Sequence, residues 1–159
     1  GVTEDSAGFL SAAIAAETSL PTDDSGWDEL AIRIITETRA AGRFVPGLGH
    51  PVHKVGDPRT PRFFELAQEH DAFGPHLSLF TAIGRAHPEV LGRTLPLNGA
   101  GVCGAVLADL GFSPAIVRGF ALLARCAGVL GHIAEEQVDP IANDIYMNVD
   151  RNIDYAPPA

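Results

Sequence analysis

The side chains best suited to chemistry are concentrated between Arg43 and Phe64, in the stretch RFVPGLGHPVHKVGDPRTPRFF. This stretch has two histidines and four cations, although the whole chain of 159 residues contains only 11 lysines and arginines. Cations of this kind bind anionic ligands, and an imidazole beside them can donate a hydrogen bond to a substrate carbonyl and stabilise its developing charge. We therefore expect His50 to be catalytic, within a pocket for an anionic ligand.

The same residues suit two other interpretations. His50, His53 and Asp57 could bind a metal ion, but no third histidine or cysteine stands at ligand spacing. Pro51 between the histidines also argues against a helical pair of ligands. We therefore predict that the site holds no metal. A loop histidine can equally be a structural residue that only hydrogen-bonds its neighbours, so the catalytic role of His50 is a hypothesis.

The prolines and glycines of this stretch determine what kind of element it forms. Each proline removes a backbone donor and restricts the residue before it, while glycines permit conformations that other residues avoid. We therefore predict a loop or short extended strands held between helices, where binding groups tend to lie. Gly47 and Gly49 leave backbone amides bare, which suits a nucleotide-like ligand, but the strand required by a dinucleotide fingerprint is missing.

Apolar residues recur at intervals of three and four on both sides of this loop, and this spacing predicts helices. No segment shows sustained two-residue alternation bounded by turns. The predicted fold is therefore all-α, with at most short strands flanking the loop. The expected helices cover residues 3–17, 27–41, 63–67 after a Thr60-Pro61 cap, 76–86, 102–110 and 113–137, with a break in the chain at 98–101.

The last of these helices carries Arg118, Arg125 and His132 at intervals of seven residues, close to two turns, so their side chains project the same way. A solvated face explains Arg118 well. Arg125 lies deep in an apolar run, where an unpaired cation would cost several kcal/mol. We expect Arg125 to be buried beside a carboxylate. The predicted inward face of the helix consists of Ile116, Val117, Phe120, Leu123, Ala127 and Leu130.

The composition narrows the class of partner and the compartment. The formal net charge of −9 argues against nucleic acid or an anionic membrane as the main partner, because both require a cationic surface. No apolar run approaches the ~20 residues of a spanning helix. Cys103 and Cys126 lie in apolar stretches and are expected to be reduced core thiols, so we predict a cytoplasmic location. The first residue is Gly1, which truncation, tag removal or maturation would each explain.

Three motifs resemble the citrate synthase superfamily. GLGHPVHKVGDPR resembles the family signature G-x-G-H-x-V-x-K-x-x-D-P-R, and VPG before it matches as well. LPLNGAGVCGAVLADLGF and LLARCAGVLGHIAEEQ follow in family order, so the resemblance covers Arg43 to Gln137. The segments HPVHK, NGAG and EEQVDPIA are most similar to the family's citryl-CoA lyases. The resemblance implies a mainly helical subunit that works as a homodimer.

The resemblance also implies a role for individual residues. His50 matches the histidine that hydrogen-bonds the carbonyl or hydroxyl of the oxaloacetate–citrate skeleton, and Arg59 and Arg125 match the arginines that bind substrate carboxylates. Lys54 stands where a basic residue can meet a coenzyme A phosphate. The backbone loop that holds the coenzyme A adenine corresponds to Val45, Pro46, Gly47, Leu48 and Gly49.

Two departures from the family pattern affect the expected chemistry. Ala100 stands where the family aspartate abstracts a proton, and alanine cannot act as a base. A second family histidine and the large N-terminal domain would precede Gly1, which favours a C-terminal part of a longer enzyme. Residues 1–112 then correspond to the small domain, and residues 113–159 to a long helix and tail that return to the large domain.

The resemblance therefore implies an enzyme that cleaves or forms a carbon–carbon bond between a coenzyme A thioester and a 2-oxo dicarboxylate. Its substrates would be acetyl-CoA or citryl-CoA and oxaloacetate or a citrate-like acid. One alternative is a non-catalytic protein that binds acyl-CoA or a dicarboxylate, which the alanine at position 100 favours. Another is an interaction module whose glycine loop is only structural.

Overall fold

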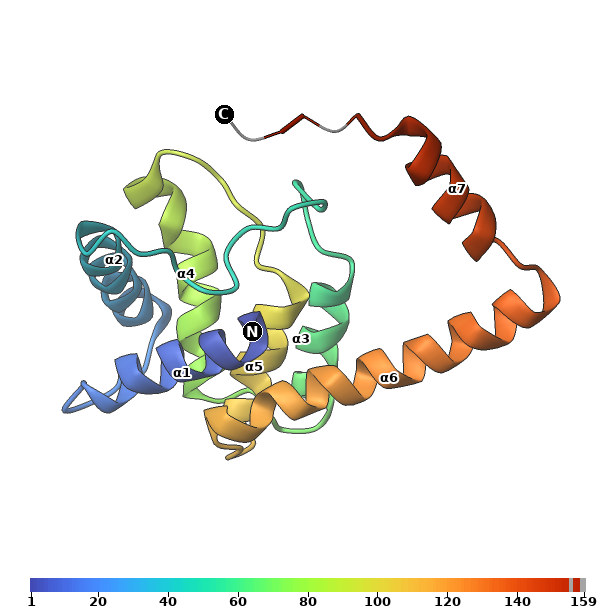
Figure 1. Ribbon diagram of the computed structural model, residues 1–159. Coiled ribbons are helices and arrows are strands. Elements are labelled where there is room, and N and C mark those ends of the chain that lie inside the picture. The colour runs from blue at the N-terminus through green and yellow to red at the C-terminus, as the bar shows by residue number, and fades with distance from the viewer. Residues whose placement is uncertain (155, 158–159) are drawn as a thin grey trace. The chain divides into compact units, whose positions relative to one another are not determined.

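The computed structural model describes residues 1–154 and 156–157. Within these residues the regular elements are all helices, joined by loops, so the predicted all-α class is confirmed (Figure 1). The extended pairing is limited to an isolated antiparallel bridge between Leu48 and Leu97. The helices are α1 (Val2–Ala15), α2 (Asp24–Ala40), α3 (Arg59–Glu69), α4 (Pro75–Leu91), α5 (Gly99–Asp109), α6 (Pro114–Val138) and α7 (Ala142–Asn152).

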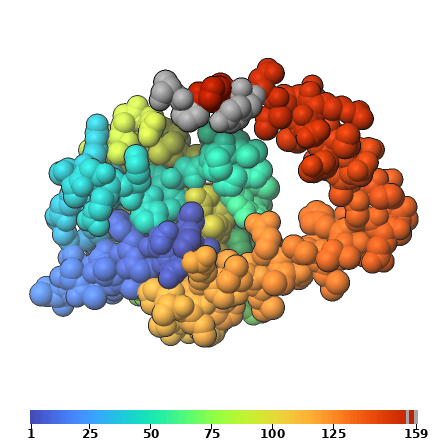
Figure 2. Space-filling model, viewed as in Figure 1, coloured from blue at the N-terminus to red at the C-terminus, as the bar shows by residue number. Residues whose placement is uncertain are grey.

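The chain divides by its internal contacts into two units, Gly1–Ala121 and Leu122–Ala159. The first unit contains α1 to α5 and the first two turns of α6. Its core lies where α4 packs against α2 and α5, and where α1 packs against α5. Figure 2 shows the atoms of α1, in dark blue, lying against the cyan atoms of later segments of this unit.

The core of the first unit follows from the helical spacing of apolar residues. Leu77, Phe80 and Ile83 recur every three residues along α4, and all three are fully buried. Leu10 of α1 and Ile35 of α2 contribute to the same cluster. Burying one such side chain contributes roughly 1.5–3 kcal/mol, so this cluster is the main stabilising element beneath the site.

Two local expectations were wrong at the starts of helices. Residues 98–101 do not break the chain, because Asn98 is the N-cap of α5 and its Oδ1 accepts a hydrogen bond from the Gly101 amide at 2.9 Å. Thr60 does not cap α3, which begins one residue earlier after Pro58. The Thr60 hydroxyl instead donates to the Leu97 carbonyl at 2.9 Å. The Thr60 bond joins the start of α3 to the segment that leads into α5.

The predicted inward face of α6 is confirmed at Val117 and wrong for the residues that follow it on the helix. Val117 is the buried residue of this helix and packs against Ala7 and Ala108, whereas Leu123 and Leu130 are each 69% exposed. An apolar stripe becomes buried only where another element covers it, and from Leu122 onward α6 belongs to the second unit. Cys126, expected in the core, is exposed as well, while Cys103 is half-buried.

The second unit contains an element that the sequence reasoning missed. Helix α7 covers Ala142–Asn152 and has no buried residue. The Glu136 carboxylate accepts hydrogen bonds from the amides of Ile141 and Ala142, at 3.0 and 2.9 Å, and so holds the turn before α7. The expectation that no apolar run is long enough to span a membrane also needs correction. Helix α6 is long and apolar enough to cross a membrane by length and composition, and 6% of the apolar stretch that meets this criterion is buried.

Candidate active site

The loop that carries His50 is fixed to the segment that leads into α5. The Gly49 amide donates to the Pro96 carbonyl at 2.7 Å, and the Asn98 amide donates to the Gly47 carbonyl at 2.9 Å. The Asn98 side chain adds a bond from Nδ2 to the Gly49 carbonyl at 2.7 Å. These bonds position the predicted coenzyme A loop, residues 45–49, next to the first turn of α5, where Ala100 lies.

The glycines of this loop are required by close packing. Gly47 and Gly49 have φ angles of +86° and +89°, a backbone region that side chains strongly disfavour. A Cβ at Gly47 would also lie 2.7 Å from the Gly101 Cα and 2.8 Å from the Phe80 ring. The loop backbone therefore rests directly on α5, with no room for a side chain between them.

A buried carboxylate lies at the centre of this region. The side chain of Asp57 is 0% exposed, and its Oδ1 accepts from the backbone amide of Arg59 at 3.0 Å and from Arg59 Nε at 2.9 Å. Its Oδ2 accepts from the second guanidinium nitrogen of Arg59 at 2.6 Å and from the Gly99 amide at 2.7 Å. The Arg59 guanidinium, followed by the two amides, holds the pKa of Asp57 well below its usual range despite burial.

The His50 side chain faces this carboxylate. Its Nδ1 accepts hydrogen bonds from the amides of Val52 and His53, at 3.1 and 3.0 Å, so the proton of the neutral ring is on Nε2. Nε2 lies 4.0 Å from Asp57 Oδ2, and the His50 side chain is 18% exposed. The ring of His53 lies beside it at a centroid distance of 4.5 Å. His50 is therefore oriented to present an Nε2–H donor.

The other predicted site residues lie nearby but make different contacts. Lys54 is exposed, and its Nζ donates to the His50 carbonyl at 3.2 Å. Val45 is buried and Pro46 is half-buried. Ala100 is half-buried in the first turn of α5, one residue after Gly99, whose amide donates to the Asp57 carboxylate.

Arg125 is not buried, contrary to the expectation from its apolar surroundings in the sequence. It is exposed, as are Arg118 and His132 on the same stripe of α6. The apolar neighbours of Arg125 along the chain occupy other faces of a helix that is itself exposed, so burial does not follow from them. His132 Nδ1 lies 3.6 Å from a carboxylate oxygen of Glu135, one turn along. Arg125 belongs to the second unit, Leu122–Ala159, whereas His50 and Arg59 belong to the first.

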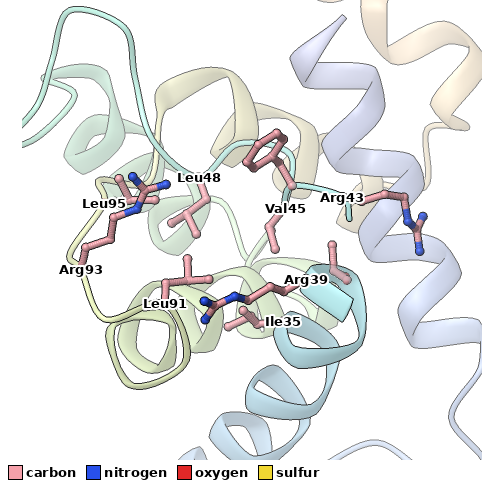
Figure 3. A pocket seen from close by; sticks show the side chains of 10 residues that line it. Ile35, Arg39, Arg43, Val45, Leu48, Leu91, Arg93 and Leu95 are labelled. Carbon is pink, nitrogen blue, oxygen red and sulfur yellow. The ribbon is translucent and has the colours of Figure 1, made fainter. Parts of the chain in front are cut away.

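A cavity of about 370 Å³ adjoins the loop on the side of Val45 and Leu48. Its floor is apolar, and Figure 3 shows Arg39 and Arg93 beside these residues, with Arg43 at the edge of the hollow. None of the three arginines forms an ion pair within residues 1–154. Sequence reasoning included Arg43 but missed Arg39 and Arg93, because only the fold brings the end of α2 and the segment after α4 to this loop.

Comparison with known proteins identifies the family. Residues 15–146 match the family described as "Citrate synthase, C-terminal domain". The chain belongs to this family. The three motifs that resemble the citrate synthase superfamily, between Arg43 and Gln137, all lie within the matched range. The resemblance inferred from them is confirmed.

Two relatives define how far the likeness extends. The mitochondrial citrate synthase of Neurospora crassa is 38% identical to this chain over 64 residues. These residues make up 40% of this chain and 14% of the fungal enzyme. The structure of citryl-CoA lyase from Hydrogenobacter thermophilus matches with a TM-score of 0.78 at 24% identity, over 100% of this chain and 59% of that one. The chain therefore shares this fold and spans only part of the length of either relative.

Proposed function

We propose that this chain carries the dicarboxylate and coenzyme A contacts of an enzyme that cleaves or forms a carbon–carbon bond in a coenzyme A thioester, most like a citryl-CoA lyase. The observation that supports this best is the meeting of His50, Arg59 and the first turn of α5 around Asp57. These groups come from two stretches of sequence, the motif that holds both His50 and Arg59 and the start of α5, and each stretch belongs to a motif that resembles the family pattern. A structural loop would not need an imidazole donor, a half-exposed guanidinium and a helix N-terminus at one point.

The chemistry proposed for His50 follows from the two amide hydrogen bonds that its Nδ1 accepts, which leave Nε2 as the donor. Its Nε2–H can donate to the carbonyl of oxaloacetate or to the hydroxyl of a citrate-like skeleton, where charge changes during reaction. Arg59 would bind a substrate carboxylate with the N–H groups that Asp57 leaves free. Arg125 would supply a second carboxylate contact once the complete active site is assembled.

In the cleavage direction, the tertiary hydroxyl of citryl-CoA would pass its proton to water, because His50 Nε2 already carries a proton, while the adjacent carbon–carbon bond breaks. The electron pair of that bond would pass to the thioester enolate, and the enolate carbon would then take up a proton. A family aspartate would serve that last transfer, but Ala100 stands in its place. Asp57 is a poor substitute, because its lowered pKa keeps it ionised and two arginine N–H groups occupy it. The proton donor must therefore come from another group or from water.

The coenzyme A part of the proposal rests on the loop of residues 45–49 and on Lys54. The backbone of this loop can hydrogen-bond an adenine through groups other than the Gly49 amide, which donates to the Pro96 carbonyl, and basic residues suit the phosphates of coenzyme A. The cavity beside Val45 and Leu48 combines an apolar floor with three arginines, a composition that suits a nucleotide-like anion. A cytoplasmic homodimer that closes one domain over the other, so excluding water from a reactive enol, completes the proposal.

The alternative is a protein that binds acyl-CoA or a dicarboxylate without turnover, and Ala100 is the observation that favours it. Release of free thiol from acetyl-CoA plus oxaloacetate, and cleavage of citryl-CoA, would distinguish the two. Turnover that is abolished in His50→Ala supports the enzyme. Tight binding of both ligands with no turnover in either direction supports the binding protein.

The chain of 159 residues by itself is expected to bind acetyl-CoA weakly, because a partial pocket is not preorganised for the whole ligand. Isothermal titration calorimetry at millimolar ligand is the measurement. Submicromolar affinity of this chain would contradict the assignment of part of the pocket to sequence outside it.

A further inference from the structure

Asp57 makes contacts that reach beyond its place in the Asp-Pro-Arg motif. One fully buried carboxylate joins the loop before α3, the Arg59 side chain and the first amide of α5. Among the described residues, no buried side-chain polar atom lacks a hydrogen-bond partner, so this carboxylate is fully satisfied. Removing it would leave three groups of the proposed site without their common partner.

The geometry limits how Arg59 can meet a substrate. A guanidinium has five N–H groups, and Asp57 engages Nε–H and one N–H of the adjacent terminal nitrogen. The remaining edge stays available, and the Arg59 side chain is 54% exposed. The bidentate contact therefore fixes the plane of the guanidinium and turns its free edge outward.

The same carboxylate fixes the position of Ala100 relative to His50. Asp57 Oδ2 accepts the Gly99 amide at 2.7 Å, one residue before Ala100, and lies 4.0 Å from His50 Nε2. A negative charge at the first turn of a helix is favourable, because the free amides and the helix dipole attract it. Position 100 is thus held next to this carboxylate and close to His50, whatever group occupies it.

We propose that Asp57 is the positioning residue of this site: its buried carboxylate fixes the Arg59 guanidinium plane and the start of α5 relative to His50. The effect expected on a substrate carboxylate rests on the function proposed above. The effect on Arg59 itself does not, and this separates a test of the inference from a test of the function.

Asp57→Asn is the test variant, because it keeps the shape but removes the charge and turns an acceptor into a donor. Asp109→Asn is a matched control. Asp109 is also buried, caps a helix and contacts a histidine: it accepts the amides of Gly74, His76 and Leu77 and the His76 ring, at 2.7–3.0 Å. It is the last residue of α5, its carboxylate contacts the start of α4, and it has no part in the proposed chemistry.

The first readout is the ¹⁵N NMR signal of Arg59 Nε–H, assigned with Arg59→Lys. A bidentate contact slows rotation and solvent exchange of the guanidinium, so the signal should be sharp at pH 7 in the wild type and in Asp109→Asn. It should be lost in Asp57→Asn. A sharp Arg59 signal in a folded Asp57→Asn variant would overturn the proposal.

The second readout is affinity for oxaloacetate and for citrate. We expect Asp57→Asn to bind them at least tenfold more weakly, with acetyl-CoA affinity unchanged and Asp109→Asn equal to the wild type. Equal affinities in both variants would overturn the positioning role. A sharp wild-type Arg59 signal with no dicarboxylate binding by the complete enzyme would instead overturn the proposed function, and the Arg59 signal alone would then decide the role of Asp57.

If Asp57→Asn does not fold, the wild type still provides a decision. The ¹³Cγ shift of Asp57 should stay constant between pH 7 and pH 4, while exposed carboxylates titrate, and the Arg59 Nε–H signal should persist over the same interval. Titration of Asp57 within this interval, or loss of the Arg59 signal while Asp57 remains ionised, would overturn the proposal.

Discussion

Two groups of charged residues suggested a function in the sequence, and the fold treats them differently. The Asp57 cluster, which we define as His50, Asp57, Arg59, Asn98 and Gly99, lies within the first unit. Hydrogen bonds join Asp57 to Arg59 and to Gly99, and join Asn98 to the carbonyl of Gly49 next to His50. The α6 stripe, which we define as Arg118, Arg125 and His132, is exposed along its length. The first group is organised by this chain itself. The second group is only aligned by helical spacing.

The difference teaches that spacing and organisation are separate properties. Residues seven apart on a helix share a face through backbone geometry alone, without any contact between them. The Asp57 cluster instead requires a loop, a helix start and an N-cap to meet, and a carboxylate at their junction. Substitutions should therefore affect folding in the first group and only ligand contacts in the second.

The largest effect is expected from Ala100→Asp, which adds an acid beside the Asp57 cluster. General-base catalysis contributes roughly 10²- to 10⁴-fold, and we expect condensation of acetyl-CoA with oxaloacetate to gain part of that range. A partial gain is expected, because the new carboxylate lacks evolved neighbours to position it. Thiol release is the assay, with His50→Ala in the same background as control. An unchanged rate with intact binding of both substrates would mean that position 100 is not the base position.

Arg125→Ala should separate ligand binding from stability on the α6 stripe. Loss of a bidentate carboxylate contact is expected to weaken dicarboxylate binding by roughly 2–4 kcal/mol in the assembled enzyme, with coenzyme A binding nearly unchanged. Because Arg125 is exposed, the free energy of unfolding should change by less than about 0.5 kcal/mol. Calorimetry and urea denaturation measure the two quantities. Equal losses for both ligands would argue against a carboxylate contact.

A pair of glycine substitutions should have opposite signs in the two regions. Gly47→Ala should lower the free energy of unfolding by about 2–3 kcal/mol, because the new Cβ meets the Gly101 backbone and the φ angle is positive. Gly128→Ala on α6 has nothing within 4 Å of its Cβ and should raise it by about 0.5–1 kcal/mol. Urea denaturation of both variants is the measurement. A neutral Gly47→Ala would show that the loop is not packed on α5.

The smallest effect concerns acid. The pKa of Asp57 is lowered in the folded chain, so its contribution to stability is present above its unfolded pKa of about 4 and is lost as pH falls toward the folded value. Between pH 5 and pH 3, the wild type should lose about 1–2 kcal/mol more stability than Asp57→Asn. Urea midpoints at both pH values measure this. Parallel losses in the two proteins would mean that Asp57 is not stabilised by its partners in the folded chain.

Much of the fold and part of the site could be predicted from the sequence, because the signals are local. Helical spacing of apolar residues predicted α1, α2 and α4, and the prolines and glycines predicted the loop that carries His50. The signature G-x-G-H-x-V-x-K-x-x-D-P-R led to the family, and the match over residues 15–146 confirms it. The start of α5 was predicted too late in the chain, because an asparagine followed by glycines can either cap a helix or interrupt one. Only the structure shows that the Asn98 side chain accepts the Gly101 amide and so caps α5.

The tertiary structure decided which of the residues singled out in the sequence lie in the same environment. The sequence suggested Asp57 as a possible metal ligand, but the fold buries Asp57 against Arg59 and against Gly99, which lies 42 positions further along the chain. Arg125 read as buried, but the apolar stripe of α6 is exposed among the described residues. The physical reason is the same in both cases: burial and charge pairing depend on which surfaces meet. The sequence determines that a face is apolar or a side chain charged, and only packing determines what lies against it.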